Sequence, residues 1–274
     1  MELYHIIYEV IVKIKIYIVT YKNDSALFEC LESLSKSQIP VGITVETNVI
    51  NNHSQFNINE NFKNVNVLHN ILRPDFSTGH LARNWNQAII NGFKNLNNPD
   101  CNILVTCQVD TIFTENWIEK LIQSHQKYCL ITACPGDGFI SYTADAIKRI
   151  GLWDERFCSI EFQECDYFTR ALIFNKDWSS INDFHHTRVL NPILEAEHDY
   201  SWIYRKNTDY ETHTISTKWS SNLLKILESK YSYHPLKAWS SSFIQNPPQL
   251  IKKQNILYPY FEHDVLSLEQ KYDW

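Results

Sequence analysis

The chain has 274 residues, 44% of them hydrophobic, which is enough to bury a substantial core in one large domain or in one domain with an appendage. Its formal net charge is -6, so it lacks the basic surface that selects nucleic acid or an anionic membrane, and we expect no nucleic-acid partner. A phosphate-bearing ligand must therefore be held locally, by a metal ion, a few cationic side chains or backbone amides.

The seven cysteines are scattered along the chain and include no C-x-x-C pair. We interpret them as reduced core residues of a cytoplasmic protein, which could also lie peripherally at a membrane, and we assign them no zinc site. The N-terminal 23 residues are apolar, but Glu2, Glu9, Lys13 and Lys15 interrupt them and β-branched residues dominate. This composition predicts a strand, and neither a signal peptide nor a transmembrane segment.

Apolar strands alternate with amphipathic helices over the first 128 residues. We expect strands at 13–20, 42–50, 65–70 and 102–109, and helices at 25–37, 80–96 and 114–128, with Ser25 and Thr114 as N-caps. Such alternation predicts an α/β fold with a mostly parallel, doubly wound sheet flanked by helices.

The pattern loosens after residue 135. Residues 135–143 are typical of a loop and a strand, and 143–151 of a short helix ended by Gly151. The prolines that follow residue 229 predict an irregular or helical tail. We therefore divide the chain into a main domain at 1–225 and a C-terminal extension at 226–274 that packs on it.

Polar residues follow the first, second and fourth predicted strands, at Tyr21 to Asp24, at Asn51 to Ser54 and at Asp110. In doubly wound sheets, ligands bind outside the carboxyl ends of the strands, near a topological switch point. These side chains are therefore candidates for a ligand site, independently of any family.

Three groups of residues could carry chemistry there. Asp110 can offer a carboxylate oxygen to a divalent cation, although a carboxylate at a strand end is also a common turn former. Five acidic residues lie among aromatic ones in residues 151–171. They are either a solvated helix start or the source of a general base that acts on an acceptor hydroxyl.

His185 and His186 form the third group, and adjacent histidines alternate sides on a strand, so at most one would face a metal. A core or surface position is the ordinary alternative for either. Together with Asp110, these histidines supply oxygen and nitrogen ligands for Mn²⁺ or Mg²⁺. Trp153, Trp178 and Tyr167 are candidates for an apolar floor under the ring of a ligand, although most tryptophans fill cores.

Several motifs resemble one family in the order in which that family has them. They are IVTYKN at 18–23, VINNHS at 49–54, GHLARNWNQAI at 79–89, QVDT at 108–111, GLWDERF with QECDYFTRA within 151–171, and STKWS at 216–220. The chain resembles the family 2 type of inverting glycosyltransferase with the GT-A fold, particularly its rhamnosyltransferase-like members.

The resemblance implies a GT-A domain at 1–225 that inverts the sugar it transfers, a hexose or deoxyhexose, from a nucleotide-diphosphate donor to a hydroxyl of a glycan, polysaccharide or glycoconjugate. It implies donor contacts by Thr20, Tyr21, Asn23, Asn51, Asn52, Arg83, Asn86 and Gln108, metal ligands at Asp110 and His185 or His186, and catalysis by Glu164 and Asp166. The expected cofactor is Mn²⁺ or Mg²⁺.

The sequence departs from the family's pattern at three places. Gln108 replaces the first Asp of the D-x-D metal motif, so Asp110 would be the main metal carboxylate. Asn51 stands where the family has an Asp that reads the nucleotide; we favour a UDP or dTDP sugar and keep GDP open. Gln163 and Glu164 replace a Glu-Asp pair, so Glu164 becomes the expected base, with Asp166 as the alternative.

Two other functions compete with this one. A non-catalytic domain that binds sugar nucleotides is favoured if Gln108 marks the loss of metal binding. A sugar nucleotidyltransferase would use a related sheet, but it would need a Gly-rich phosphate loop after the first strand, and the residues TYKNDS at 20–25 contain no Gly.

Overall fold

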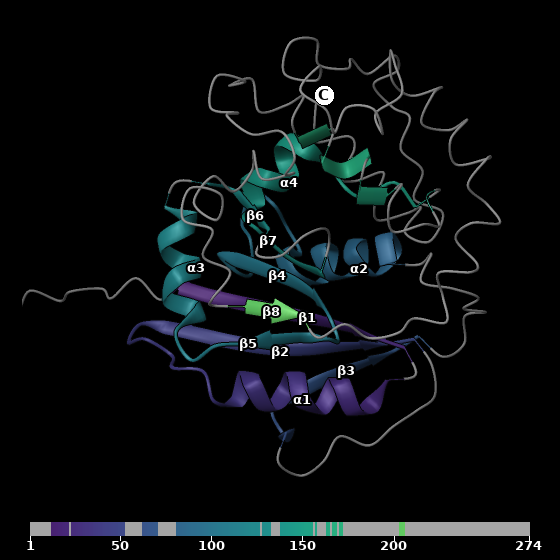
Figure 1. Cartoon of the computed structure of the whole chain (residues 1–274). Helices are drawn as coiled ribbons and strands as arrows, with labels where there is room; N and C mark the ends of the chain where they lie inside the picture. Colours follow the sequence, from purple (N-terminus) through teal and green to yellow (C-terminus); the bar gives the residue numbers. More distant parts are fainter. Residues whose placement is uncertain are drawn as a thin grey trace, which may run out of the picture.

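The computed structural model describes residues 12–21, 23–52, 62–70, 81–126, 128–132, 138–155 and 203–205, and positions 157, 163, 164, 166–168, 170 and 171. A central sheet carries helices on both faces (Figure 1). Its strands are β1 (Val12–Thr20), β2 (Ile43–Asn51), β3 (Val65–His69), β4 (Ile103–Gln108), β6 (Leu130–Thr132) and β7 (Phe139–Tyr142).

The strand order is β3-β2-β1-β4-β7-β6. Strands β1 to β4 are parallel, and β7 runs antiparallel to both of its neighbours. This confirms the expected α/β fold with a mostly parallel sheet. A separate pair joins β5 (Thr111–Phe113) antiparallel to β8 (Ile203–Arg205). It brings the chain near residue 205 beside the segment that directly follows Asp110.

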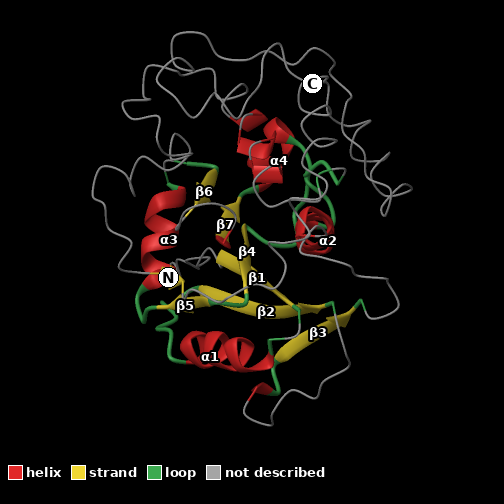
Figure 2. Cartoon of the chain, turned by 45° about the vertical axis from the view of Figure 1, so that its right-hand side comes forward, coloured by secondary structure: helices red, strands yellow, loops and turns green. Residues whose placement is uncertain are grey.

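The helices are α1 (Asp24–Ser35), α2 (Leu81–Phe93), α3 (Trp117–His125) and α4 (Ala144–Ile150). Helix α1 connects β1 to β2, and α2 connects β3 to β4 from the opposite side of the sheet (Figure 2). Because β1 pairs with β2 on one side and β4 on the other, the topological switch point lies between β1 and β4.

The alternation of side chains along β1 separates two apolar cores. Ile14, Ile16 and Ile18 are buried among residues of α1 and α3, whereas Tyr17 and Val19 are buried among residues of α2 and α4. Alternate side chains of β1 therefore point into the two cores on opposite faces of the sheet, as expected for a central parallel strand.

The four expected strands and three expected helices are confirmed, with small differences at their ends, but both expected caps are wrong. The side chain that caps α1 belongs to Asn23, whose Oδ1 accepts a hydrogen bond from the Ala26 amide at 3.2 Å; the Ser25 hydroxyl only donates to that same oxygen. Thr114 is not the cap of α3, because a turn precedes this helix and its first residue is Trp117. The Thr114 hydroxyl donates instead to Asn116 Oδ1 at 3.2 Å.

Other expectations have mixed outcomes. Gly151 ends α4 with φ of 85°, a conformation that favours glycine, as expected. The short strands β5 and β6 were not predicted. Four cysteines in the described part are free thiols, three of them buried. The expected extension at 226–274 and the first 11 residues lie outside the described residues.

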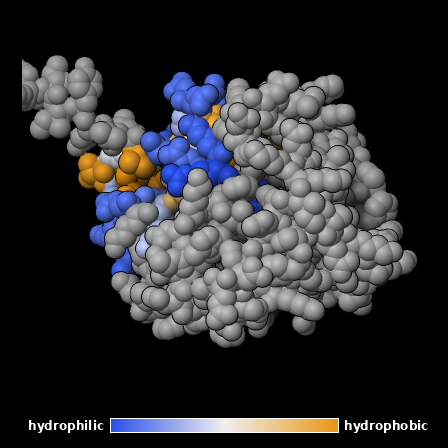
Figure 3. All heavy atoms as spheres, turned by 90° about the horizontal axis from the view of Figure 1, so that it is seen from above, coloured by the Kyte–Doolittle hydropathy of each residue, from blue (hydrophilic) through white to orange (hydrophobic). Residues whose placement is uncertain are grey.

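The described surface is mostly polar. Its exposed large hydrophobic side chains are Ile39 and Val41, both between α1 and β2. Figure 3 shows the face seen from above, where the coloured residues are mainly hydrophilic beside a smaller hydrophobic group. Within the described residues, no helix has the length and apolar content needed to cross a bilayer.

Candidate functional site

The parallel strands end together at the edge that holds most of the expected donor-binding residues. Thr20 pairs with Asn51 across β1 and β2, and Val19 pairs with Gln108 across β1 and β4. The Asn52 amide continues the pairing, because it donates to the Thr20 carbonyl at 3.1 Å. The structure therefore brings the residues after β1, β2 and β4 to one edge, with the switch point between Thr20 and Gln108.

Thr20 has the most informative side chain at this edge. It is only 2% exposed, and its Oγ1 is buried with no hydrogen-bond partner in the part of the chain that the structure describes. Buried hydroxyls almost always have partners, and an unpaired one costs about 1–3 kcal/mol. A ligand that accepts or donates a hydrogen bond there would remove this cost.

The neighbouring expected residues divide by accessibility. Tyr21 is half-buried at the end of β1. Asn23 uses its side-chain oxygen to cap α1. Asn51 is buried, and its Nδ2 lies 3.3 Å from the His69 ring nitrogen Nδ1. We expected the side chains of Asn23 and Asn51 to face a nucleotide. In this structure the Asn23 oxygen caps α1 instead, and the Asn51 Nδ2 contacts His69.

A buried amide cluster, which the sequence analysis did not predict, supports the edge from the side of α2. Asn70 Nδ2 donates to Gln87 Oε1 at 2.8 Å and to Asn52 Oδ1 at 3.1 Å, and Asn84 Oδ1 lies 3.5 Å away. All four side chains are buried. Because each amide holds the next, the cluster fixes α2 against the ends of β2 and β3.

Arg83 and Asn86 meet one carboxylate, Glu155. Arg83 Nε donates to Glu155 Oε2 at 3.1 Å, and Asn86 Nδ2 donates to Glu155 Oε1 at 3.0 Å. Asn86 also donates to the Trp153 carbonyl and accepts from the Trp153 amide, both at 2.8 Å. Both ends of the Asn86 amide group are thus hydrogen-bonded within the protein, and the residue is fully buried. This argues against the expected contact between Asn86 and a donor. Arg83, in contrast, is half-buried.

Glu164 and Asp166, the expected catalytic pair, lie in different environments. Glu164 is half-buried. Asp166 is 0% exposed, and Arg170 binds its Oδ2 through Nη2 at 2.9 Å and Nε at 3.0 Å. A buried carboxylate paired in this way holds the fold together, and Glu164 is the more accessible of the two.

Gln163 has a structural role that its place in the motif did not suggest. It is buried, and its Oε1 accepts a hydrogen bond from the Ala82 amide at 3.0 Å. Ala82 lies in the first turn of α2, where amides lack partners within the helix. The segment before Glu164 is thereby tied to the start of α2.

Trp153 and Tyr167 belong to the core. Their rings stack with centroids 4.0 Å apart and planes 5° apart, and both residues are 0% exposed. The expectation that they form a floor under a sugar ring is therefore wrong, because neither ring has a free face toward solvent. Trp178 lies outside the described residues.

Asp110 lies directly beyond β4 and is buried, two positions after Gln108. Their side-chain oxygens are of the type that Mn²⁺ and Mg²⁺ take, so they fit part of a ligand shell. Within the described ranges, no group of three or more His, Cys, Asp or Glu side chains is placed to hold a metal. His185 and His186 lie outside these ranges, so the structure does not test them.

No protein-family model matches the sequence, and no curated protein matches it. Solved structures with similarity include S. aureus TarS 1-349, at 14% identity and a TM-score of 0.43, where the match covers 60% of this chain and 56% of that chain. TarS 1-349 in complex with UDP-GlcNAc is 12% identical with a TM-score of 0.39, and the match covers 58% of this chain and 54% of that chain. The mannosyltransferase PcManGT from Pyrobaculum calidifontis, in complex with GDP-Man and Mn²⁺, is 10% identical with a TM-score of 0.39. That match covers 85% of this chain and 82% of that chain. The chain thus spans little more than half the length of the TarS fragment.

Proposed function

We propose that the chain is a glycosyltransferase that moves a sugar from a nucleotide-diphosphate donor to a hydroxyl acceptor and inverts the anomeric centre. One observation carries the proposal. At the switch point of a doubly wound sheet, where ligands bind, Thr20 keeps a buried hydroxyl without a partner in the described residues. Gln108 and Asp110 lie on the adjacent strand end, and the motif order resembles that of inverting family 2 enzymes.

The chain's own groups would divide the work at this edge. Thr20 and Gln108 bind polar groups of the donor. For Asn51 to pair with the edge of a pyrimidine base, as in the favoured UDP or dTDP sugar, its Nδ2 must leave the His69 ring nitrogen. Asp110, with His185 or His186, would hold Mn²⁺ or Mg²⁺, and this metal would neutralise charge on the departing diphosphate. The formal charge of -6 makes such a cation useful, because the chain as a whole repels a diphosphate.

Glu164 is the proposed general base. Its half-buried position leaves the carboxylate within reach of a ligand, and it takes the proton from the acceptor hydroxyl as the oxygen attacks the anomeric carbon. The Asp166–Arg170 pair and the Gln163–Ala82 bond fix the helical segment that carries it. Attack from the face opposite the diphosphate gives inversion.

Two buried threonines of the central strands, Thr20 in β1 and Thr106 in β4, offer a matched test. Thr106 lies on β4, and its hydroxyl lies within 3.5 Å of the Ile140 carbonyl and 3.4 Å of the Tyr142 hydroxyl, so it already has partners. Thr20→Val should keep or raise the thermal stability but weaken donor binding, because it removes a hydroxyl that only a ligand would satisfy. Thr106→Val should lower stability and leave donor affinity unchanged.

The measurement is thermal shift against UDP-, dTDP-, GDP- and CMP-linked sugars, since a ligand that binds only the native state raises its stability. The best donor is then titrated into both variants. If Thr20→Val binds it as tightly as wild type, Thr20 does not contact the donor. A stabilisation confined to GDP sugars would overturn the pyrimidine preference.

A non-catalytic sugar-nucleotide-binding domain is the second candidate, and Gln108 in place of a metal carboxylate favours it. Donor hydrolysis separates the two candidates. The proposed enzyme should release nucleoside diphosphate slowly from its donor when Mn²⁺ is present, because water can replace the acceptor. Binding without any release, with acceptors supplied, would favour the second candidate.

A further inference from the structure

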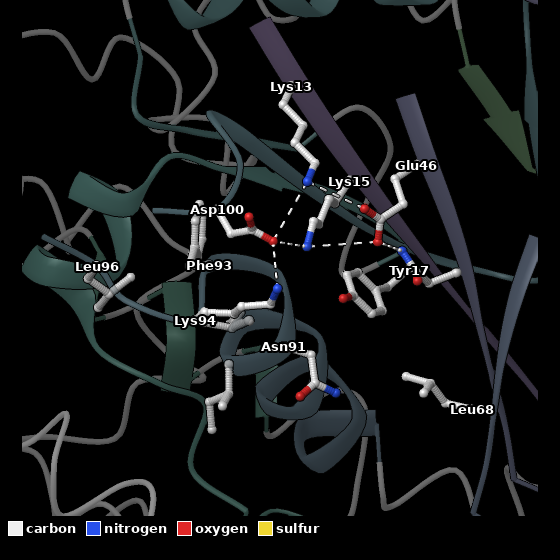
Figure 4. Close-up of a pocket in the computed structure, with 13 residues that line it drawn as sticks. Lys13, Lys15, Tyr17, Glu46, Leu68, Asn91, Phe93, Lys94, Leu96 and Asp100 are labelled. Atoms are coloured by element: carbon white, nitrogen blue, oxygen red, sulfur yellow. Dashed lines mark hydrogen bonds and ion pairs between the residues drawn. The ribbon is translucent and has the colours of Figure 1, made fainter. Parts of the chain in front are cut away.

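A cavity lies on the α2 side of the sheet, away from the carboxyl edge. Its volume is about 730 Å³, within the usual range for small-molecule sites. Its lining residues come from β1, β2 and β3, and from the C-terminal end of α2 with the loop that follows (Figure 4). Thr20 and Asp110 are not among them.

Three ammonium groups and two carboxylates meet in this cavity. Asp100 Oδ2 binds Lys15 Nζ at 2.7 Å, Lys94 Nζ at 3.0 Å and Lys13 Nζ at 3.7 Å. Glu46 lies 3.6 Å from Lys13 and 3.8 Å from Lys15. One positive charge therefore remains in excess, although the whole chain is acidic.

Lys15 has donor capacity that the described residues do not use. Its side chain is only 4% exposed, yet among these residues its one hydrogen bond goes to Asp100, because the 3.8 Å contact with Glu46 is too long. An ammonium group has three N–H donors. A buried ammonium with spare donors calls for a further acceptor.

Tyr17 gives an independent sign of a ligand. It is 3% exposed and lines the cavity, and its hydroxyl points toward the side of the cavity that holds the Lys15 and Lys94 side chains (Figure 4). No described residue bonds to this hydroxyl. Burial, with smaller contributions from Glu46 and Asp100, raises the Tyr17 pKa well above its usual value. The hydroxyl therefore keeps its proton and can donate it to an anion.

The cavity also has an apolar part, since Leu68, Ile89, Phe93 and Leu96 are among its lining residues. We propose that this cavity binds a small organic monoanion, a carboxylic acid with an apolar body, whose carboxylate accepts hydrogen bonds from Lys15 and Tyr17. A single negative charge matches the excess of one ammonium group, whereas a diphosphate would be repelled by Asp100 and Glu46. This site is separate from the proposed donor site, and both can be filled at once.

Calorimetry with three probes tests the proposal: hexanoate, benzoate and 3-phenylpropionate, each compared with its neutral primary amide. At least one acid should bind wild type about tenfold or more tightly than its amide, because a hydrogen bond to a charged group is the stronger kind. Tyr17→Phe keeps the ring that packs in the core and should weaken acid binding by a similar factor. Lys36→Met, which removes a surface ion pair elsewhere, should bind the acid as wild type does.

Three results would overturn the proposal. They are the absence of binding by all three acids, equal binding of each acid and its amide, and Tyr17→Phe binding as tightly as wild type. Displacement of a bound acid by UDP would also count against it, because that result would place the acid at the carboxyl edge. Thermal melting of Tyr17→Phe checks that the variant is folded, so that its loss of binding reports the hydroxyl.

Discussion

Side chains at the carboxyl edge differ in whether the fold uses their hydrogen-bonding capacity. Asn86 is fully used by Glu155 and Trp153, and Asp166 is held by Arg170. Thr20 is buried with an unused hydroxyl. A group that the fold already satisfies stabilises the scaffold, and one that it does not satisfy is available to a ligand. This distinction selects Thr20 above Asn86 as a donor-binding residue.

Glu164→Gln tests the base at the residue scale. The variant keeps the size of the side chain and its hydrogen bonds but removes the basicity, so turnover should fall by roughly 100-fold or more. Donor affinity should barely change. Steady-state kinetics with donor binding by calorimetry measures both quantities.

Asp166→Asn is the companion variant. Its main effect should be on stability, because it leaves the buried Arg170 charge without its counterion, at a cost of about 3–5 kcal/mol. Urea unfolding measures this cost. If Glu164→Gln turns over normally while a folded Asp166→Asn loses turnover with donor binding intact, Asp166 is the base.

His125 gives a prediction about pH. Its Nδ1 lies 2.9 Å from the Tyr128 carbonyl, which can only accept, so Nδ1 carries the proton and Nε2 accepts from Ser141 Oγ at 2.6 Å. Burial lowers the pKa of His125 from 6.5 to about 4, against a smaller opposing effect of the Tyr128 carbonyl. The unfolded chain therefore binds a proton at a pH where the folded chain does not.

The stability that the neutral His125 ring provides is complete above about pH 6.5 and is lost as the pH falls toward about 4. The loss should be on the order of 3 kcal/mol. His125→Gln should be less stable at neutral pH, but its free energy of unfolding should fall less between about pH 7 and about pH 5. Parallel urea titrations that fall equally for both proteins would contradict this account.

At the scale of elements, Gly92 shows how closely α2 packs on β4. A Cβ atom at this position would collide with the side chain of Leu104, which is fully buried in β4. Helix propensity alone predicts that Gly92→Ala stabilises the protein by about 1 kcal/mol. We expect the reverse, a loss of about 1–3 kcal/mol, because the core must shift to accept the methyl group.

Chemical denaturation of Gly92→Ala measures this effect, with Asn91→Ala at the neighbouring exposed position as the control. The control should change stability little. A Gly92→Ala variant that is more stable than wild type would show that α2 can move away from Leu104 without cost.

The long elements could be predicted from the sequence because their periodicity is strong. The apolar runs of β1 and β4 and the helical spacing in α2 each extend over several residues. Strands β5, β6 and β8 have three residues each, too few for a period to be visible. The cap of α1 was missed because Asn23 and Ser25 are both good cap residues and only backbone geometry decides between them.

At the scale of the whole molecule, the position of the candidate site could be predicted but its internal contacts could not. Parallel strands bring their carboxyl ends together, so Thr20, Asn51 and Gln108 were expected at one edge. The bond between Asn86 and Glu155 joins residues 69 positions apart, and nothing in a single sequence indicates such a pair. The cavity beside α2 could not be predicted either, because Lys13 and Lys15 interrupt an apolar segment and nothing in the sequence places them beside Lys94 and Asp100.

We propose that this edge holds a nucleoside diphosphate through a divalent cation bound by Asp110. Calorimetric titration of UDP with Mn²⁺ and with a chelator, into wild type and Asp110→Asn, tests it most directly. Wild type should bind UDP about tenfold or more tightly with Mn²⁺, a gain of about 1.4 kcal/mol, and Asp110→Asn should bind it equally weakly in both buffers. Equal affinity of wild type with Mn²⁺ and with chelator would contradict the claim.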